Sequence, residues 1–562
     1  MRGVLAAGRA LPARWDAPLQ AALGAALFLA AALFIAAPVL ALLSRACFDG
    51  AGEFVGLGNF AAYFDSPALT DSALRSLRLS ATAALITVAL AYGYAYGLTL
   101  TRMRHKAFFR AAALVPLLAP SLLMAISLVY LFGHQGLLKD WLGRPIYGEL
   151  GIVVGSVLWT FPHALLILIA SLSAIDARLV EAARTMGASP WEVFRTVMLP
   201  ASRYGLAMAF VVVFVLVITD FGVPKVVGGQ ANVLATDLYK QVIGQQNFAM
   251  GAVVGAVLLA PAIAAFALER HLRRRQSSIL GARAVPYAPE PWALRDRLFW
   301  AYCAVVSALL VGVIAMAVYA SFVRLWPYDL SLSLRNYDFE HTDGGGWATY
   351  GNSLRLAFAT ALGGTMLAFL SAWFVVKPRR FGALRDGVNL LATVPLAVPG
   401  LALGLGYIMF FNAPGHPLSG IYATMTILVI CTVVHFFSVA HLTLVTALGQ
   451  LDREFEYVAE SLGVPFWQTL LRVHLPVALP ALLEVAGYFF VNAMTTVSAV
   501  VFLYAPHTQL ASVAVLNMDD AGDIAPAAAM AVLIFVTAAA VRLGFMAVER
   551  WVLARTNRWR RR

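Results

Sequence analysis

The sequence predicts an all-α integral membrane protein with about twelve membrane-spanning helices, arranged as two parallel six-helix repeats. Of its 562 residues, 61% are apolar and only 12% are charged, and the mean hydropathy is +0.78. Soluble domains usually carry about twice that share of charged residues. The apolar residues form long blocks, such as residues 21–43 and 152–171, and roughly 20 apolar residues cross a bilayer as one helix. Three sequence landmarks also occur twice, in the same order.

Charged stretches and stretches rich in Gly or Pro separate the apolar blocks and set the limits of the predicted spans. The first block is too long for the apolar core of a signal peptide, and Arg45 argues against a lipid-attachment site at Cys47. The three cysteines have neither disulfide nor metal-ligand spacing, so we predict no metal site. The twelve predicted spans cover residues 19–43, 76–100, 111–132, 151–173, 203–222, 249–268, 298–322, 353–376, 388–411, 420–447, 478–504 and 527–548.

The distribution of charge predicts the orientation. With both termini in the cytoplasm, 31 of the 41 Lys and Arg residues lie on the cytoplasmic side of the twelve spans. Lys and Arg resist translocation, so a wrong number of spans would scramble this alternation. The net charge of +12 therefore needs no nucleic-acid partner. We expect the basic residues 558–562 to anchor the C-terminus at anionic lipid of the bilayer.

The landmarks show that the chain is an internal duplication. Each one reappears at an offset of 276 to 279 residues, and three matches in order with nearly equal offsets are hard to obtain by chance. The pairs are residues 76–79 and 353–356, residues 115–120 and 394–399, and residues 187–200 and 463–476.

Each half holds six predicted spans, and an even number lets both halves enter the membrane in the same direction. Parallel repeats pack about an axis along the membrane normal and enclose a shared pathway between them. We predict a first membrane domain over residues 1–270, a cytoplasmic linker over 271–297 and a second membrane domain over 298–562. Each domain contains one large cytoplasmic loop, at residues 175–200 and 451–476.

The sequence of the loop in the first half predicts its local structure. Residues 175–186 form a helix, and Gly187 supplies the positive φ that ends it. Ser189, Pro190 and Glu192 then provide an N-cap, a first-turn proline and a carboxylate at the third position, so a second helix begins at once. Small residues on the first helix, Ala182 and Ala183, allow another protein to approach closely.

Both loops resemble the signature of ABC importer permeases, which reads Glu-Ala-Ala, three residues, Gly, nine residues, Ile, one residue, Leu-Pro. The second copy departs from it at Tyr457 and Val458, where the family has Glu and Ala. The alternative is that both segments are ordinary amphipathic loops between spans. The residues expected to carry the signature's function are Glu181, Ala182, Ala183 and Gly187 in the first loop, and Ala459, Glu460 and Gly463 in the second.

This resemblance covers the whole chain and implies the type I ABC importer permease fold in a bacterial inner membrane. Each loop is then a coupling helix that docks on one of two copies of a separate ATPase. A periplasmic binding protein delivers the solute to a pathway between the halves. The sequence contains no Gly-Lys pair and hence no phosphate-binding loop of the usual type. The chain is therefore expected to be a transport subunit, not an enzyme, and to bind no cofactor itself, since ATP and Mg²⁺ belong to the ATPase.

Two other classes of protein fit less well. A two-by-six secondary transporter shares the duplication, but it needs ionisable coupling residues deep in the spans and no paired docking loop. A membrane enzyme needs a convergent catalytic constellation. The dense polar cluster outside the spans, at residues 519–523, is better explained as a contact with the binding protein.

Polar residues at the outer ends of the fifth and eleventh spans are the candidates for the solute pathway, because lipid-facing positions would leave them unsatisfied. Asp220 and Lys225 can receive a zwitterionic solute, or they pair with each other. The counterparts in the second half are Asn492, Thr495, Thr496 and Ser498.

The solute is suggested by resemblance alone. Residues 219–248 and 495–523 are similar to the fused permeases assigned to 2-aminoethylphosphonate uptake. The fused permeases for ferric iron are the next most similar group. We therefore expect 2-aminoethylphosphonate as the solute, with Fe³⁺ as the alternative.

Overall fold

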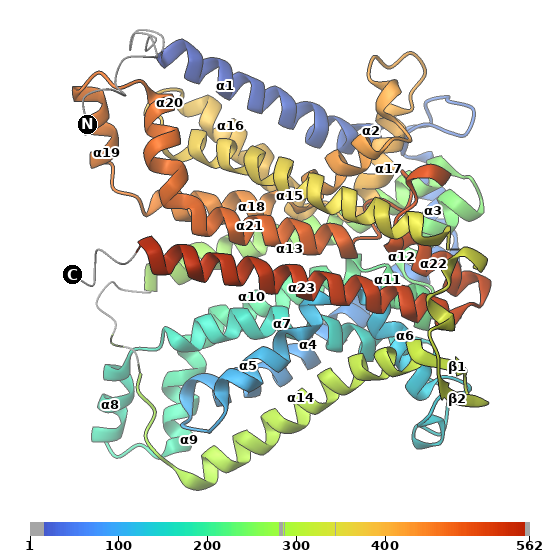
Figure 1. The fold of residues 1–562 in the computed structure, drawn as a ribbon, viewed down its shortest axis with the longest axis horizontal. Coiled ribbons are helices and arrows are strands. Elements are labelled where there is room, and N and C mark those ends of the chain that lie inside the picture. The colour runs from blue at the N-terminus through green and yellow to red at the C-terminus, as the bar shows by residue number, and fades with distance from the viewer. Residues whose placement is uncertain (1–15, 280–284, 286, 343, 557–562) are drawn as a thin grey trace.

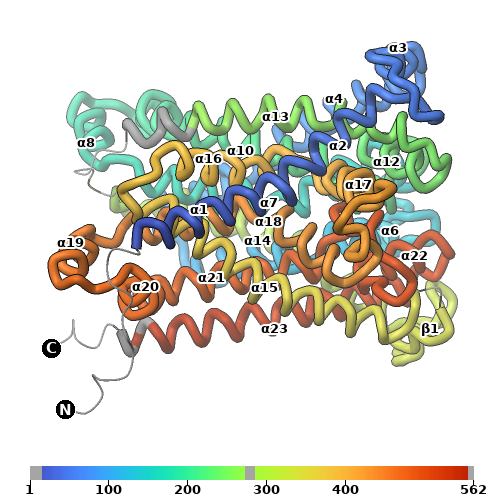
Figure 2. Tube along the Cα trace, turned by 90° about the horizontal axis from the view of Figure 1, so that it is seen from above, coloured from blue at the N-terminus to red at the C-terminus, as the bar shows by residue number. Residues whose placement is uncertain are grey.

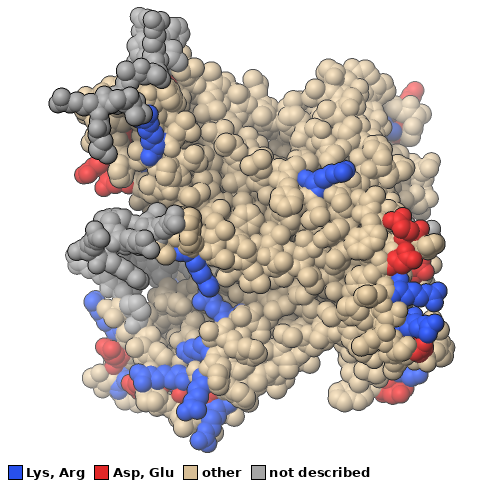
Figure 3. All heavy atoms as spheres, viewed as in Figure 1, with Lys and Arg blue, Asp and Glu red and all other residues tan. Residues whose placement is uncertain are grey.

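The computed structural model describes residues 16–279, 285, 287–342 and 344–556. In this part of the chain, ten helices are long and apolar enough to cross a membrane, and two bent helix pairs raise the number of spans to as many as twelve. The predicted C-terminal anchor at residues 558–562 and part of the predicted linker lie outside the described residues. Charged side chains gather toward the two ends of the bundle, and the face between them carries few (Figure 3).

The first half contains helices α1 to α13 (Figure 1). Short π-helical turns follow α1 and α9, and a third follows α12. The bounds are α1 (Asp16–Ala31), α2 (Ala37–Arg45), α3 (Gly58–Asp65), α4 (Pro67–Leu100), α5 (Lys106–Leu114), α6 (Ser121–Phe132), α7 (Glu149–Ser173), α8 (Ala177–Thr185), α9 (Pro190–Val193), α10 (Leu199–Thr219), α11 (Gly222–Val227), α12 (Leu234–Tyr239) and α13 (Phe248–Ile279).

The second half repeats this order, with a hairpin of two antiparallel strands added between α14 and α15. Its elements are α14 (Ala293–Phe322), β1 (Val323–Leu325), β2 (Asp329–Leu332), α15 (Gly346–Val376), α16 (Gly382–Thr393), α17 (Gly400–Phe411), α18 (Met425–Gly449), α19 (Glu454–Ser461), α20 (Phe466–Thr469), α21 (Leu475–Thr495), α22 (Ala511–Ala521) and α23 (Ile524–Thr556).

The two halves have equivalent helices, which confirms the predicted duplication. α7, α8 and α10 of the first half correspond to α18, α19 and α21 of the second, with starting residues that differ by 276 to 277. The loops with α8 and α19 lie at one end of the bundle, and α12 and α22 lie at the other (Figures 1 and 2). We call these the α8–α19 end and the α12–α22 end. α1 begins and α23 finishes at the α8–α19 end.

The first helix of each half packs on the other half. α1 and α2 lie along α16 and α17, and α14 lies along α4, α5 and α6 (Figure 1). The buried Tyr407 hydroxyl donates to the Phe34 carbonyl at 2.7 Å, and the buried Tyr94 hydroxyl lies 2.7 Å from Ser307 Oγ. Because each crossing carries a buried polar contact, it fixes the alignment of the helices as well as burying apolar surface.

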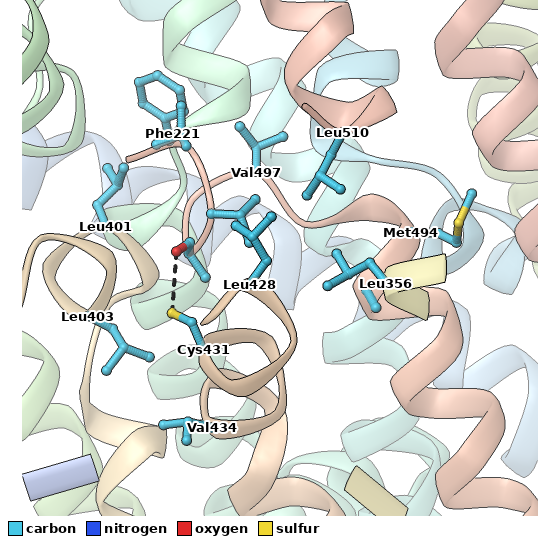
Figure 4. Close-up of a cluster of buried hydrophobic side chains, with 14 of the residues drawn as sticks. Phe221, Leu356, Leu401, Leu403, Leu428, Cys431, Val434, Met494, Val497 and Leu510 are labelled. Carbon is cyan, nitrogen blue, oxygen red and sulfur yellow. Dashed lines mark hydrogen bonds between the residues drawn. The ribbon is translucent and has the colours of Figure 1, made fainter. Parts of the chain in front are cut away.

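Both halves contribute to the largest apolar core. Phe221 of the first half lies among second-half side chains that include Leu401 and Leu428, and it is only 1% exposed (Figure 4). In the same region the Cys431 thiol donates to the Ala499 carbonyl at 3.4 Å. The shared core means that the halves are interlocked.

The third and ninth predicted spans, 111–132 and 388–411, are each a bent pair of helices and not one continuous helix. α5 and α6 meet at 101°, and α16 and α17 at 115°. The break lies at Ala119 in one half and Val398 in the other, where the backbone is extended. A proline follows each of these residues, and proline disfavours helical backbone in the residue before it and lacks the N–H that would continue the helix.

The eleventh predicted span, 478–504, is also too long. α21 ends at Thr495, and Thr496 has extended backbone, as Asp220 does at the equivalent end of α10. The apolar run continues from Val497 to Leu503 without forming a helix. Each apolar residue in this run is less than 9% exposed. Its apolarity therefore reflects burial inside the protein and not contact with lipid.

Candidate coupling loops and transport pathway

The first loop folds as its sequence predicts. The Asp176 carboxylate caps α8 by accepting from the Arg178 N–H at 3.1 Å, and Gly187 ends the turn with a φ of +83°. Ser189 and Glu192 form the predicted capping box at the start of α9: the Ser189 N–H donates to the Glu192 carboxylate at 2.7 Å, and the Glu192 N–H donates to Ser189 Oγ at 3.3 Å. Local hydrogen bonds thus set where the two short helices begin.

The second loop has the same form with different caps. The Glu454 N–H at the start of α19 donates to Asp452 Oδ1 at 3.2 Å, and the Phe466 N–H at the start of α20 donates to Asp16 Oδ2 of α1 at 3.0 Å. Gly463 has a φ of +66° and separates α19 from α20, which begins after the extended Pro465. A Cβ at either Gly463 or Gly187 would meet no atom within 4 Å, so the positive φ is what favours glycine at both turns.

Most of the predicted coupling residues are at the surface. Glu181, Ala182 and Gly187 are exposed in the first loop, whereas Ala183 lies on the buried face of α8. Glu460 and Gly463 are exposed in the second loop, and Ala459 is half-buried. Beside them each loop exposes apolar side chains, among them Met186 (82%), Trp191 (67%) and Leu462 (71%). An exposed apolar patch with a polar rim is typical of a surface that meets another protein.

At the α12–α22 end, Asp220 is occupied by contacts within the first half. Its Oδ1 accepts from Ser121 Oγ at 2.9 Å and its Oδ2 accepts from the Val223 N–H at 2.9 Å. Asp220 therefore caps α11 and ties the end of α10 to the start of α6. Its contact with solute stays a prediction.

Lys225 pairs with a residue of the other half. Its Nζ lies 2.8 Å from Asp520 Oδ1 and 5.4 Å from the ring centre of Tyr239. The alternative that Lys225 pairs with Asp220 is therefore wrong, since each has another partner. The Lys225–Asp520 pair joins α11 to α22 across the two halves. Next to it, burial and the Asp520 carboxylate raise the pKa of Asp519 to about 6, although Lys225 acts in the opposite direction.

The four candidates from the second half make mostly local contacts. The Asn492 amide donates to the Tyr488 carbonyl at 2.8 Å, and Thr495 Oγ1 donates to the Val491 carbonyl at 3.1 Å, both within α21. Thr496 is 7% exposed, and its carbonyl accepts from Ser512 Oγ at 2.6 Å. Ser498 lies against Gly400 of α17, because a Cβ there would come within 2.4 Å of its Oγ.

Within the described residues, none of the six candidates lines either of two surface pockets, of about 640 and 490 Å³. The contacts that sequence reasoning missed are Ser121, Tyr239 and Asp520 around Asp220 and Lys225. Residues 519–523 did stand out as an acidic cluster, but no local pattern links them to a lysine almost 300 residues earlier.

Comparison with known proteins decides the family. The model of the binding-protein-dependent transport system inner membrane component matches residues 85–278 and again residues 360–553, which together make up more than half of the chain. The chain belongs to this family. It is a fused, duplicated permease of a binding-protein-dependent ABC importer, a multi-pass protein of the inner membrane, and such permeases are not enzymes.

Curated relatives of the permease differ in solute and in coverage. It is 27% identical over 475 residues to the ferric transport system permease protein FbpB of Actinobacillus pleuropneumoniae, covering 82% of this chain and 68% of the relative. It is 23% identical over 485 residues to the Fe(3+)-transport system permease protein FbpB 2 of Haemophilus influenzae, covering 85% and 90%. PhnV of Salmonella choleraesuis, provisionally assigned to 2-aminoethylphosphonate transport, is 23% identical over 213 residues, or 37% of this chain and 77% of PhnV.

Proposed function

We propose that the permease carries ferric iron across the inner membrane, together with a periplasmic binding protein and two copies of an ABC ATPase. The observation that supports this is the span of the similarity. The FbpB proteins match 82% and 85% of this chain, across both halves, whereas the match to PhnV covers 37%. PhnV is itself matched over 77% of its length, so the support comes from the ferric permeases being similar to both halves together. We therefore place Fe³⁺ first, the reverse of the order that the sequence resemblance suggested.

The α8–α19 end is, in this proposal, the cytoplasmic end, with both termini on the same side. The excess of Lys and Arg in the predicted cytoplasmic segments supports this orientation. α8 and α19 dock on the two ATPase subunits through the exposed parts of the signature, Glu181, Ala182 and Gly187 in one loop, and Glu460 and Gly463 in the other. The apolar side chains beside them, such as Met186, add buried area to each contact. ATP and Mg²⁺ stay on the ATPase, and the permease itself holds no cofactor.

The solute pathway, in this proposal, runs between the halves from the α12–α22 end. Asp220, Lys225, Asn492, Thr495, Thr496 and Ser498 flank its outer entrance. The Lys225–Asp520 ion pair bridges the halves there at 2.8 Å and has to part before the entrance widens.

The test is uptake into proteoliposomes that contain the permease, its ATPase and its binding protein, with ATP enclosed on the ATPase side. We expect ATP-dependent uptake of Fe³⁺ when the ferric binding protein is supplied. Replacement of Gly187 or Gly463 by Val forces a β-branched residue to a positive φ, at about 1–3 kcal/mol, and should abolish uptake. Gly351→Ala is the matched control, because Gly351 lies in α15 with open space around it and no positive φ.

The second candidate solute is 2-aminoethylphosphonate. The observations that favour it are the similarity of residues 219–248 and 495–523 to phosphonate permeases and the match to PhnV. The same proteoliposomes, supplied with an aminoethylphosphonate-binding protein in place of the ferric one, distinguish the two. ATP-driven uptake of the phosphonate without uptake of Fe³⁺ would replace the first proposal by the second.

A further inference from the structure

The duplication allows the two coupling helices to be compared position by position. Glu456 of α19 stands where α8 has Val180, and His474 stands where the first half has Met198, both at an offset of 276. Lys377 is the residue that follows α15. In the first half, Val180 and Met198 belong to an apolar cluster and are 0% and 5% exposed. The second half replaces this apolar contact by ionisable groups.

These groups form one connected network beneath α19. Lys377 Nζ and His474 Nε2 each lie 2.8 Å from the same oxygen, Glu456 Oε1. Lys377 also donates to the Leu451 carbonyl at 3.2 Å. The side chains of Lys377 and His474 are 3% and 1% exposed, and that of Glu456 is 24% exposed. The network therefore lies largely out of water, where a hydrogen-bonded ion pair resists displacement because breaking it leaves a buried charge unpaired.

The geometry also sets the protonation of His474. The Trp373 indole N–H donates to His474 Nδ1 at 3.0 Å. An indole nitrogen can only donate, so Nδ1 carries no proton and Nε2–H donates to Glu456. His474 is thus neutral, and the single positive charge of Lys377 balances Glu456. Trp373 belongs to α15, Glu456 to α19, and His474 to the π-helical turn before α21, so three segments meet at one carboxylate.

The loop after α15 also holds the exposed face of α19. The Arg379 guanidinium lies 4.0 Å from the ring centre of Tyr457 and 4.0 Å from Glu460 Oε2. Tyr457 is one of the two positions at which the second loop departs from the family signature. Lys377 contacts the buried side of α19 and Arg379 contacts its exposed side, and together they fasten α19 to the end of α15.

The first coupling helix is fastened elsewhere. Arg184 of α8 pairs with Glu290 and donates to the Tyr287 hydroxyl at 3.2 Å, and both partners lie in the linker before α14. The Ala177 N–H donates to the Val285 carbonyl of the same linker at 2.9 Å. In the first half, Arg102, from the loop after α4, donates to the Pro289 carbonyl of the linker. α8 thus contacts the chain that leads to α14, and α19 contacts the helices of its own half.

We propose that Lys377, Glu456 and His474 form an ionic joint through which movement of α19 is passed to α15 and α21, with Glu456 as its positioning residue. This inference rests on the proposed docking of α19 on an ATPase subunit. Contacts such as those of Val180 tolerate sliding, because apolar packing is not directional. The ionic joint fixes distance and direction, so the second half follows its coupling helix as one body although its signature is degenerate.

The test measures ATP hydrolysis and solute uptake together in the reconstituted importer. Glu456→Gln keeps the size of the side chain but removes its charge. We expect uptake per ATP hydrolysed to fall by about tenfold, while ATP hydrolysis stays within about twofold of the wild type, which is the pattern of lost coupling. Glu53→Gln is the matched control, an exposed glutamate at the α12–α22 end, and it should change neither quantity.

A second variant separates coupling from mere support of α19. Lys377→Leu, Glu456→Val and His474→Met together give the second half the residues of the first, which pack without a buried charge. Lys377 corresponds to the buried Leu100, because residues 76–79 and 353–356 of the same two helices have an offset of 277. We expect this triple variant to keep the melting temperature and the binding of the ATPase but to stay poorly coupled. Recovery of wild-type uptake per ATP in the triple variant, or full coupling in Glu456→Gln, would overturn the joint. Absence of ATP-driven uptake in the wild type would instead contradict the proposed function.

Discussion

Removal of the Lys225–Asp520 ion pair should favour the state in which the α12–α22 end is open. The pair is 2.8 Å long, with side chains 23% and 45% exposed. A pair of this exposure contributes about 0–1 kcal/mol, and the contact of Lys225 with Tyr239 adds about 0.5 kcal/mol. If the pair exists only in the closed state, Asp520→Asn shifts the equilibrium toward the open state by up to about fivefold. Lys225→Met should shift it somewhat further, because it also loses the ring contact.

The assay is ATP hydrolysis by the reconstituted importer without its binding protein, because hydrolysis then depends on spontaneous opening. We expect the rate of ATP hydrolysis to rise by about two- to fivefold in Asp520→Asn. The rate in the double variant that combines Asp520→Asn with Lys225→Met should be only slightly higher than the rate in Lys225→Met alone. The matched control is Arg324→Met, which removes the 3.8 Å Arg324–Asp329 pair within the β1–β2 hairpin of one half. A rate in Asp520→Asn that equals both the wild-type and the control rates would refute a closing role for the pair.

Three further predictions concern stability. Ser189→Ala removes one bond of the capping box and should cost about 1 kcal/mol, seen as faster proteolysis of the first loop; equal cleavage rates would contradict it. Tyr407→Phe removes the bond to the Phe34 carbonyl and should cost about 1 kcal/mol, with a lower melting temperature; an unchanged one would show that the crossing of α1 and α2 does not depend on that bond. Asp519 has a pKa of about 6, above the ordinary value of about 3.9, so the folded state favours its neutral form. The stability that the neutral form of Asp519 contributes is present at pH 4 and is lost as the pH rises through 6. The melting temperature of Asp519→Asn should therefore rise relative to that of the wild type between pH 4 and pH 8. A difference in melting temperature that stays constant over this range would contradict the raised pKa.

The features that sequence reasoning predicted well depend on neighbours in the chain. The capping box of Ser189 and Glu192 and the turn at Gly187 involve residues within a few positions of each other, so their pattern is visible in the sequence. The duplication is visible because similar residues recur at a constant offset. The bends at Ala119 and Val398 were within reach as well, since the prolines that follow them belong to a repeated landmark.

The features that were missed depend on distant partners. No local pattern shows that α1 and α14 pack on the opposite half, or that Lys225 meets Asp520. The sequence predicts residues 497–503 as part of a membrane helix, because burial in protein and burial in lipid select the same apolar side chains. The network around Glu456 joins residues from three segments and becomes evident only when they are placed together.

In the proposed function, this permease imports solute by coupling to an ATPase on another chain. The most direct test is solute uptake into proteoliposomes that hold the wild-type permease with its ATPase and binding protein, measured with ATP and then with an ion gradient alone. We expect uptake of Fe³⁺ that needs ATP, the ATPase and the binding protein, and no uptake from the ion gradient alone. Uptake driven by the gradient in the absence of the ATPase would contradict the proposed function and would make the chain a secondary transporter.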